Sequence, residues 1–331
     1  TLVSCSSDDL NSLSDNSSKN EAISFDGYLG RSAVAVNGSR GSELDKTALQ
    51  KPTEGFGVFG NYTATDVTTT TYGENLFKNQ KVTYSTDDTK WTYTPVKYWS
   101  PAGHIDFLAY APYVENKELK ENSKLDFTVS STIANQKDLL WANATNQTKT
   151  DQPVTFTFTH ALAKIGYSVK TSTAAAEGTT ITLNKITLAG SGDGTKDAFY
   201  SAGTIDLSKT SSTGLWTNLN SETKLKFEWV PTNKTLSTTL TKNSDTEYLF
   251  VIPQDFSQKT TSADALYVVV DYTITYSDQI TMNTKVYKQL KQEFEQGKAY
   301  TINLSIGLTP IEFNADVTEW GTSNDIPVTW N

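Results

Sequence analysis

The sequence predicts an all-β protein built as two tandem β-sandwich domains with little helix. Thr and Ser are abundant, and short runs of alternating apolar and polar residues recur along the chain, whereas sustained helical periodicity is rare. A chain of 331 residues is long enough to bury two ordinary hydrophobic cores. We therefore expect one domain over residues 22–152 and a second over residues 153–331.

The first 21 residues form a polar tail with one informative position. Ser6–Asn20 is nearly all Ser, Asp, Asn and Lys, a composition too polar to fold. Cys5 is the single cysteine of the sequence and ends the segment LVSC, which resembles a bacterial lipobox, where the cysteine is acylated. Acyl chains gain about 0.8 kcal/mol per buried CH₂, so two or three hold a protein durably on a membrane. We expect a lipidated Cys5 and a disordered tether; the alternative is a free cysteine in a disordered tail.

The first domain is expected to begin with a strand at Ile23 and Phe25, followed by a strand at Ala33–Val36. Gly55–Tyr62 is another apolar run, whose three glycines suggest bulges or close backbone approach. Val82 and Tyr84 are predicted to form a hairpin with Trp91 and Tyr93, because a short polar turn separates two alternating runs.

The stretch Trp91–Pro112 is expected to form the core of the first domain. Its second half, Ile105–Tyr110, is apolar on both parities except for Asp106, which is typical of a central strand covered on both faces. Clustered Trp and Tyr side chains could also stack on sugars. Strands of β-sandwiches place such rings inside more often than outside, so we favour a core role.

The second domain is expected to begin with the alternating residues Val154, Phe156 and Phe158. The alternation breaks at His160–Ala163, which indicates either a bulge or the crossover from one sandwich to the other. Lys288–Gln296 has apolar residues at helical spacing before a glycine and is predicted to be one short helix. Further strands are expected at 181–188, 225–230, 248–252, 266–276 and 300–308, with shorter ones near Val286 and Phe313.

The residues that usually carry catalysis or bind metals show no characteristic pattern. His104 and His160 are the two histidines, and both lie inside apolar runs, where a hydrogen-bonded core residue is the more common role. No nucleophile motif, phosphate-binding loop or dinucleotide fingerprint occurs. The net charge of −9 disfavours nucleic acid as a partner. We expect a protein that is not an enzyme and that has no cofactor and no metal.

The arginines show an unusual distribution. Arg31 and Arg40 are the only two in the sequence, and both follow the first expected strand. An arginine-specific protease would cut there and nowhere else, and would separate the Ile23–Phe25 strand from the rest of the chain. The alternative is a composition bias toward lysine with accidental placement of the two arginines.

The order of segments resembles the fimbrillin family of Bacteroides-type surface pili, the type V pilus subunits and their Mfa-like relatives. The resemblance implies two β-sandwich domains of transthyretin-like topology and export to the outer membrane as a lipoprotein. For polymerising members it also implies removal of an N-terminal strand by an arginine-specific protease and replacement of that strand by one from the next subunit. The matching segments are LVSC, ISFDGYLGR, GFGVFG, KYWSPAGHIDFLAYAP, FTFTHALAKI, EYLFVIPQ, GKAYTINLSIGLTPIEF and VTEW.

A replacement strand needs alternating apolar residues and a free end. Ile326, Val328 and Trp330 alternate near the C-terminus and are the candidate donor strand; the alternative is that they form this subunit's own last strand. The expected function is a structural and adhesive fimbrial subunit at the cell surface. Its expected partners are other pilin subunits, ligands on host or bacterial surfaces, and the outer membrane through its lipid anchor before processing. The alternative from another class is a monomeric glycan-binding surface lipoprotein.

Overall fold

The computed structural model describes residues 21–29, 54–232, 234–258, 264–307 and 313–319. Over these residues the protein is built of strands, with a single 3₁₀ turn, η1 (Ile133–Asn135). The predicted all-β fold is confirmed. The predicted strand at Ala33–Val36 lies outside the described residues.

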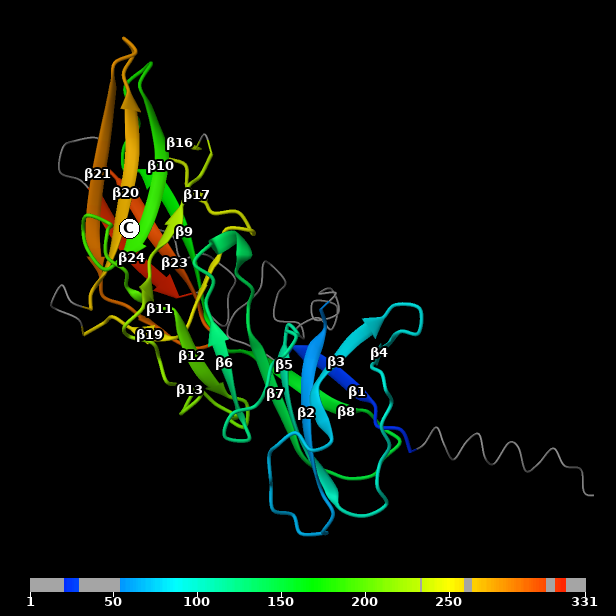
Figure 1. Cartoon of the computed structure of the whole chain (residues 1–331). Helices are drawn as coiled ribbons and strands as arrows, with labels where there is room; N and C mark the ends of the chain where they lie inside the picture. Colours follow the sequence, from blue (N-terminus) through cyan, green and yellow to red (C-terminus); the bar gives the residue numbers. More distant parts are fainter. Residues whose placement is uncertain (1–20, 30–53, 233, 259–263, 308–312, 320–331) are drawn as a thin grey trace, which may run out of the picture.

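A seven-stranded sheet forms the N-terminal part of the molecule (Figure 1), and its strand order is β1-β8-β7-β5-β2-β3-β4. The predicted hairpin is confirmed, because Tyr84 of β3 pairs with Trp91 of β4. Gly60 of β2 follows a register shift against β3, as the glycine-rich sequence indicates. The strands are β1 (Phe25–Leu29), β2 (Phe56–Thr63), β3 (Phe77–Ser85), β4 (Lys90–Thr92), β5 (His104–Ala111), β7 (Leu140–Gln147) and β8 (Val154–His160).

The C-terminal part contains two five-stranded sheets whose inward side chains share one hydrophobic cluster. One consists of β10 (Thr180–Ala189), β15 (Phe227–Trp229), β16 (Lys234–Leu236), β20 (Leu266–Thr275) and β21 (Thr281–Leu290). The other consists of β9 (Ala163–Thr171), β17 (Thr241–Lys242), β18 (Leu249–Val251), β23 (Ala299–Ile306) and β24 (Phe313–Glu319).

Three small sheets complete the fold. The largest pairs β6 (Lys124–Thr128) with β12 (Ala202–Asp206), and β12 in turn pairs with β13 (Trp216–Thr217), so it joins segments from both halves of the sequence. The other two are pairs of very short strands: β11 (Phe199–Tyr200) with β14 (Lys224–Leu225), and β19 (Gln254–Asp255) with β22 (Glu293–Phe294).

The helix predicted at Lys288–Gln296 is wrong. Leu290 ends β21, and Phe294 lies in β22. Both side chains are buried, but from two separate strands. The ten-residue pairing of β21 with β20 outweighs the weak helical spacing of this segment.

The strand pairing shows that the chain passes from the N-terminal sheet to the C-terminal sheets between β8 and β9. Val154–His160, which a boundary at residue 152 assigns to the second domain, pairs with β1 and β7 of the N-terminal sheet. The next strand, Ala163–Thr171, pairs with β23 in the C-terminal part. The break in alternation at His160–Ala163 therefore coincides with the crossover between sheets.

Candidate functional site

β1 is the first described strand of the chain. Among the described strands it lies at one edge of the N-terminal sheet. β1 runs parallel to β8, with Phe25 opposite Val154 and Leu29 opposite Phe158 (Figure 1). The peptide N–H of Val154 donates to the carbonyl of Ser24 at 2.8 Å. Local sequence patterns do not specify this parallel pairing, because Phe25 and Val154, which the register places opposite each other, are 154 − 25 = 129 positions apart in the sequence.

The residues just before β1 are held on their other side by the loop around Tyr98. The N–H of Ile23 donates to the carbonyl of Lys97 at 2.9 Å, and the N–H of Trp99 donates to the carbonyl of Glu21 at 2.7 Å. The Tyr93 hydroxyl also donates to the carbonyl of Ile23, at 2.5 Å. Burial raises the pKa of Tyr93, so its hydroxyl stays protonated and remains a donor.

The inward face of this segment inserts an aromatic anchor into the sheet's core. Ile23 and Phe25 alternate with partly exposed neighbours and are buried. The Phe25 ring centroid lies 5.4 Å from that of Phe77, 5.2 Å from Tyr93, 5.5 Å from Phe107 and 5.7 Å from Phe156. Burying a phenylalanine side chain contributes about 1.5–3 kcal/mol, and each aromatic pair adds about 0.5–1.5 kcal/mol. β1 is therefore an integral strand of the sheet, and Phe25 ties it to the core.

The socket that receives Phe25 comes largely from the stretch Trp91–Pro112 and from β8. Trp91, Trp99 and Phe107 are buried in the same hydrophobic cluster, which confirms a core role for these aromatics, whereas Tyr98 of the same stretch is 58% exposed. Among the residues that the structure describes, the indole N–H groups of Trp91 and Trp99 have no hydrogen-bond partner. If β1 were withdrawn, one edge of β8 and this aromatic socket would be left open, and another strand could fill both.

The sequence-predicted site residues lie outside the described residues. Cys5, Arg31 and Arg40 fall in residues 1–20 and 30–53, and the candidate donor strand, Ile326, Val328 and Trp330, falls in residues 320–331. In the sequence, Arg31 follows the last residue of β1 by two positions. A cut after Arg31 or Arg40 would leave β1 on the N-terminal fragment. The sequence predicts a strand that contains Phe25 but not the four ring contacts of this side chain, which come from residues distant in the sequence.

Both histidines are hydrogen-bonded core residues, as predicted. His104 Nε2 lies 3.2 Å from the Asp106 carboxylate and 3.2 Å from the carbonyl of Thr69. His160 Nδ1 bonds to Asp138 at the crossover between sheets. Burial opposes protonation of His160, but the charge and the hydrogen bond of Asp138 outweigh it and raise the pKa.

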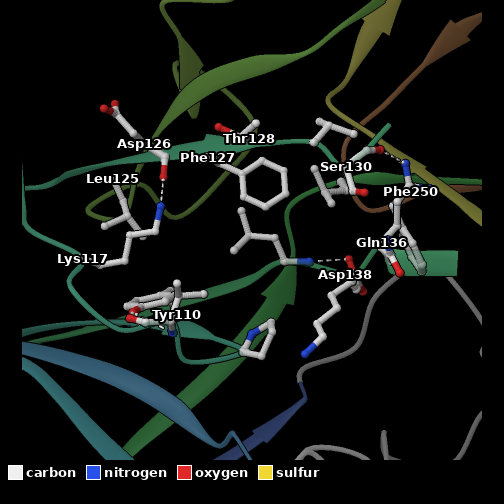
Figure 2. Close-up of a pocket in the computed structure, with 17 residues that line it drawn as sticks. Tyr110, Lys117, Leu125, Asp126, Phe127, Thr128, Ser130, Gln136, Asp138 and Phe250 are labelled. Carbon is white, nitrogen blue, oxygen red and sulfur yellow. Dashed lines mark hydrogen bonds between the residues drawn. The ribbon is translucent and has the colours of Figure 1, made fainter. Parts of the chain in front are cut away.

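A hollow of about 180 Å³ lies where β6 approaches β5 and Phe250 (Figure 2). Its floor is apolar, and the polar groups around it are used by the fold. Lys117 Nζ donates to the Asp126 carbonyl at 2.7 Å, and the N–H of Phe250 donates to Gln136 Oε1 at 2.7 Å. This hollow offers apolar surface rather than an arrangement of reactive groups.

Within the described residues, no helix is long and apolar enough to cross a membrane. No group of three or more His, Cys, Asp or Glu side chains in the same part of the chain could hold a metal ion.

Comparison with known proteins gives consistent matches. The fimbrillin-like family model matches residues 45–320. The fimbrium subunit Fim1C of Phocaeicola vulgatus is 25% identical over 378 aligned residues, which cover 98% of this chain and 94% of that protein.

Solved structures share the fold. A fimbrial protein from Bacteroides vulgatus has a TM-score of 0.68 at 19% identity, covering 91% of this chain and 99% of that chain. A candidate cell adhesion protein from Bacteroides uniformis has a TM-score of 0.51 at 18% identity, covering 90% of this chain and 99% of that chain. These likenesses show a common all-β architecture along nearly the whole length of both relatives.

Proposed function

The chain belongs to the fimbrillin-like family, and on that premise we propose that it is a structural and adhesive subunit of a cell-surface fimbria. In this proposal the protein is exported as a lipoprotein anchored through Cys5. A protease cut at Arg31 or Arg40 then releases β1, and a strand from the next subunit takes its place. The role is structural rather than enzymatic.

The observation that carries this proposal is the position of β1. It is the first described strand, it ends two residues before the first of only two arginines in the sequence, and its Phe25 side chain is buried in the sheet's core. Loss of β1 leaves β8 with an unpaired edge beside an aromatic socket. An alternating apolar strand satisfies both the backbone groups and the socket, which is the physical basis of strand exchange.

The C-terminal segment supplies a candidate donor within the same chain. Ile326, Val328 and Trp330 alternate with other residues, so their side chains could share one face of an added strand. Pro327 lacks an N–H and would have to face away from the ladder partner. Head-to-tail exchange of this kind is a heterologous contact, which generates an open polymer when its rotation does not close into a ring.

The test uses an arginine-specific protease on the purified precursor and on an Arg31→Lys, Arg40→Lys double variant. The lysines keep the positive charges but are not cut. We expect the wild-type protein to be cleaved once or twice and to form polymers visible by size-exclusion chromatography and electron microscopy, while the double variant stays monomeric. N-terminal sequencing should then give Ser32 or Gly41. Equal polymer formation by the uncut double variant would overturn processing at these arginines.

A further inference from the structure

A second candidate site lies on the outer face of the β10-β20-β21 sheet, in the C-terminal part of the molecule (Figure 1). It starts from a β-bulge in β10. The register between β10 and β20 shifts between Leu183 and Lys185. Leu183 and Ile186 are buried on the inner face, so the bulge leaves two consecutive residues, Asn184 and Lys185, on the outer face. Bulges commonly re-aim side chains at binding sites.

The bulge starts a chain of side-chain hydrogen bonds across the three strands. Asn184 Nδ2 donates to Thr273 Oγ1 at 2.7 Å, and the Thr273 hydroxyl donates to Asn283 Oδ1 at 2.8 Å. This arrangement fixes the orientation of both amides. It directs the Asn184 Oδ1 acceptor and the Asn283 Nδ2 donors to interactions outside the chain of bonds. One amide thus presents an acceptor and the other presents donors. Such a pair suits recognition of neighbouring hydroxyl groups, which both donate and accept hydrogen bonds.

The same residues border a shallow hollow of about 410 Å³, which includes Asp271 and Lys285 in its lining. This volume lies within the range of about 300–1,000 Å³ that is typical of small-molecule sites. Asp271 Oδ1 lies 3.8 Å from Lys285 Nζ, and Asp271 Oδ2 is buried and accepts no hydrogen bond from any described residue. An unsatisfied carboxylate oxygen is costly, and a hydroxyl donor from a ligand would relieve that cost if Lys285 moved aside.

Each lysine of this hollow lies next to a carboxylate. Lys285 lies beside Asp271, and Lys185 Nζ lies 3.5 Å from Glu228 Oε1. Glu228 Oε1 is shared with Lys226, whose Nζ lies 3.9 Å away. Because both lysines of the hollow are paired with carboxylates, the hollow suits a neutral ligand rich in hydroxyl groups better than an anion.

An exposed aromatic ring extends the hollow along β21. Asn283, Lys285 and Tyr287 alternate on one face of that strand, so each follows the last by about 7 Å. The Tyr287 side chain is 59% exposed. It is nevertheless held in place, because its ring lies 6.2 Å from the Tyr267 ring and directly over Gly192, where a Cβ would approach within 2.7 Å. A rigid, exposed tyrosine is a stacking platform whose immobilisation costs little entropy.

We infer that this face is a binding site for a neutral saccharide of two or more pyranose units. One unit occupies the hollow, where Asn184, Asn283 and Asp271 contact its hydroxyl groups. The next unit stacks its apolar C–H face on Tyr287. This site is separate from β1, so it requires no strand exchange and is present in the unprocessed subunit.

The test measures binding of the purified, unprocessed full-length chain to a glycan array of neutral oligosaccharides, followed by calorimetric titration of each glycan that binds. We expect Tyr287→Ala and Asn283→Ala each to weaken binding at least tenfold, and Tyr287→Phe to keep most of it. Tyr98→Ala is the matched control, because Tyr98 is 58% exposed and lies beside β1 instead; its affinity should equal that of the wild type.

Unchanged thermal unfolding midpoints would show that the variants are folded. The proposal is overturned if the wild-type chain binds no neutral glycan, or if binding survives both Tyr287→Ala and Asn283→Ala. It is also overturned if Tyr98→Ala weakens binding as much as they do. Because the unprocessed chain is used, none of these outcomes depends on whether the subunit polymerises.

Discussion

Asp106 is a buried polar residue whose position stands out in the sequence but whose hydrogen-bond partners the sequence does not predict. It is the one polar residue within Ile105–Tyr110, and its side chain is buried. Its two oxygens accept hydrogen bonds from the N–H of Thr71 at 2.9 Å and from the N–H of Asn146 at 2.7 Å. The sequence identifies Asp106 as an exception in an apolar run. It does not identify the partners, which lie 35 and 40 residues away.

Replacing Asp106 with Ala is expected to lower the free energy of unfolding by about 3 kcal/mol. The substitution removes two part-buried hydrogen bonds to a charged acceptor, and a hydrogen bond to a charged group contributes about 1.5–3 kcal/mol. Urea unfolding followed by tryptophan fluorescence measures the change. Asp87→Ala, at an exposed turn, should change it by less than about 0.5 kcal/mol. Equal effects of the two substitutions would contradict the anchoring role of Asp106.

At the scale of elements, the sequence predicts strands better than their partners. The alternation of Val154, Phe156 and Phe158 predicts β8, and the structure confirms it. Its parallel pairing with β1 depends on contacts between distant segments, which no local pattern contains. The bulge at Asn184 is similarly hidden, because a single extra residue in β10 becomes visible only when the partner strand β20 is in place.

Phe25 is expected to determine how firmly β1 is held. Phe25→Ala removes four ring contacts and should lower the free energy of unfolding by about 3–5 kcal/mol. It should also speed amide hydrogen exchange in β1 more than in β5, since β1 would open locally before the sheet unfolds. Val67→Ala, at a 59% exposed side chain, is the control for stability. Uniform acceleration of exchange across the whole sheet would argue against local release of β1.

At the scale of the whole molecule, chain length predicts a division into two domains with separate cores. In the structure, the two parts share one of the hydrophobic clusters. One hydrophobic cluster contains Phe25, Phe107 and other residues of the N-terminal sheet. The larger cluster joins Tyr110 and Trp141 to residues of the C-terminal sheets such as Tyr167. Composition and chain length predict enough apolar surface for two cores. They do not predict that the side chains on one face of β5 lie in one cluster and those on its other face lie in the second.

The contacts between the two parts predict cooperative unfolding. The Trp141 indole N–H donates to the carbonyl of Lys209 at 2.9 Å, and Asn143 Nδ2 donates to the carbonyl of Leu207 at 2.9 Å. These bonds tie β7 to the chain that follows β12, beside the larger cluster. Differential scanning calorimetry should therefore show one transition rather than two, although chains of this size often unfold in steps.

Asn143→Ala tests that coupling directly. Loss of its hydrogen bonds to the Leu207 and Lys209 carbonyls should cost about 1–3 kcal/mol. The midpoint should fall by at least roughly 2 °C, and Thr68→Ala, on an exposed loop, should leave it unchanged. If the two parts are coupled mainly through these bonds, the single calorimetric peak should also broaden or split. Two separate peaks in the wild-type protein would show instead that the shared cluster does not make the two parts unfold together.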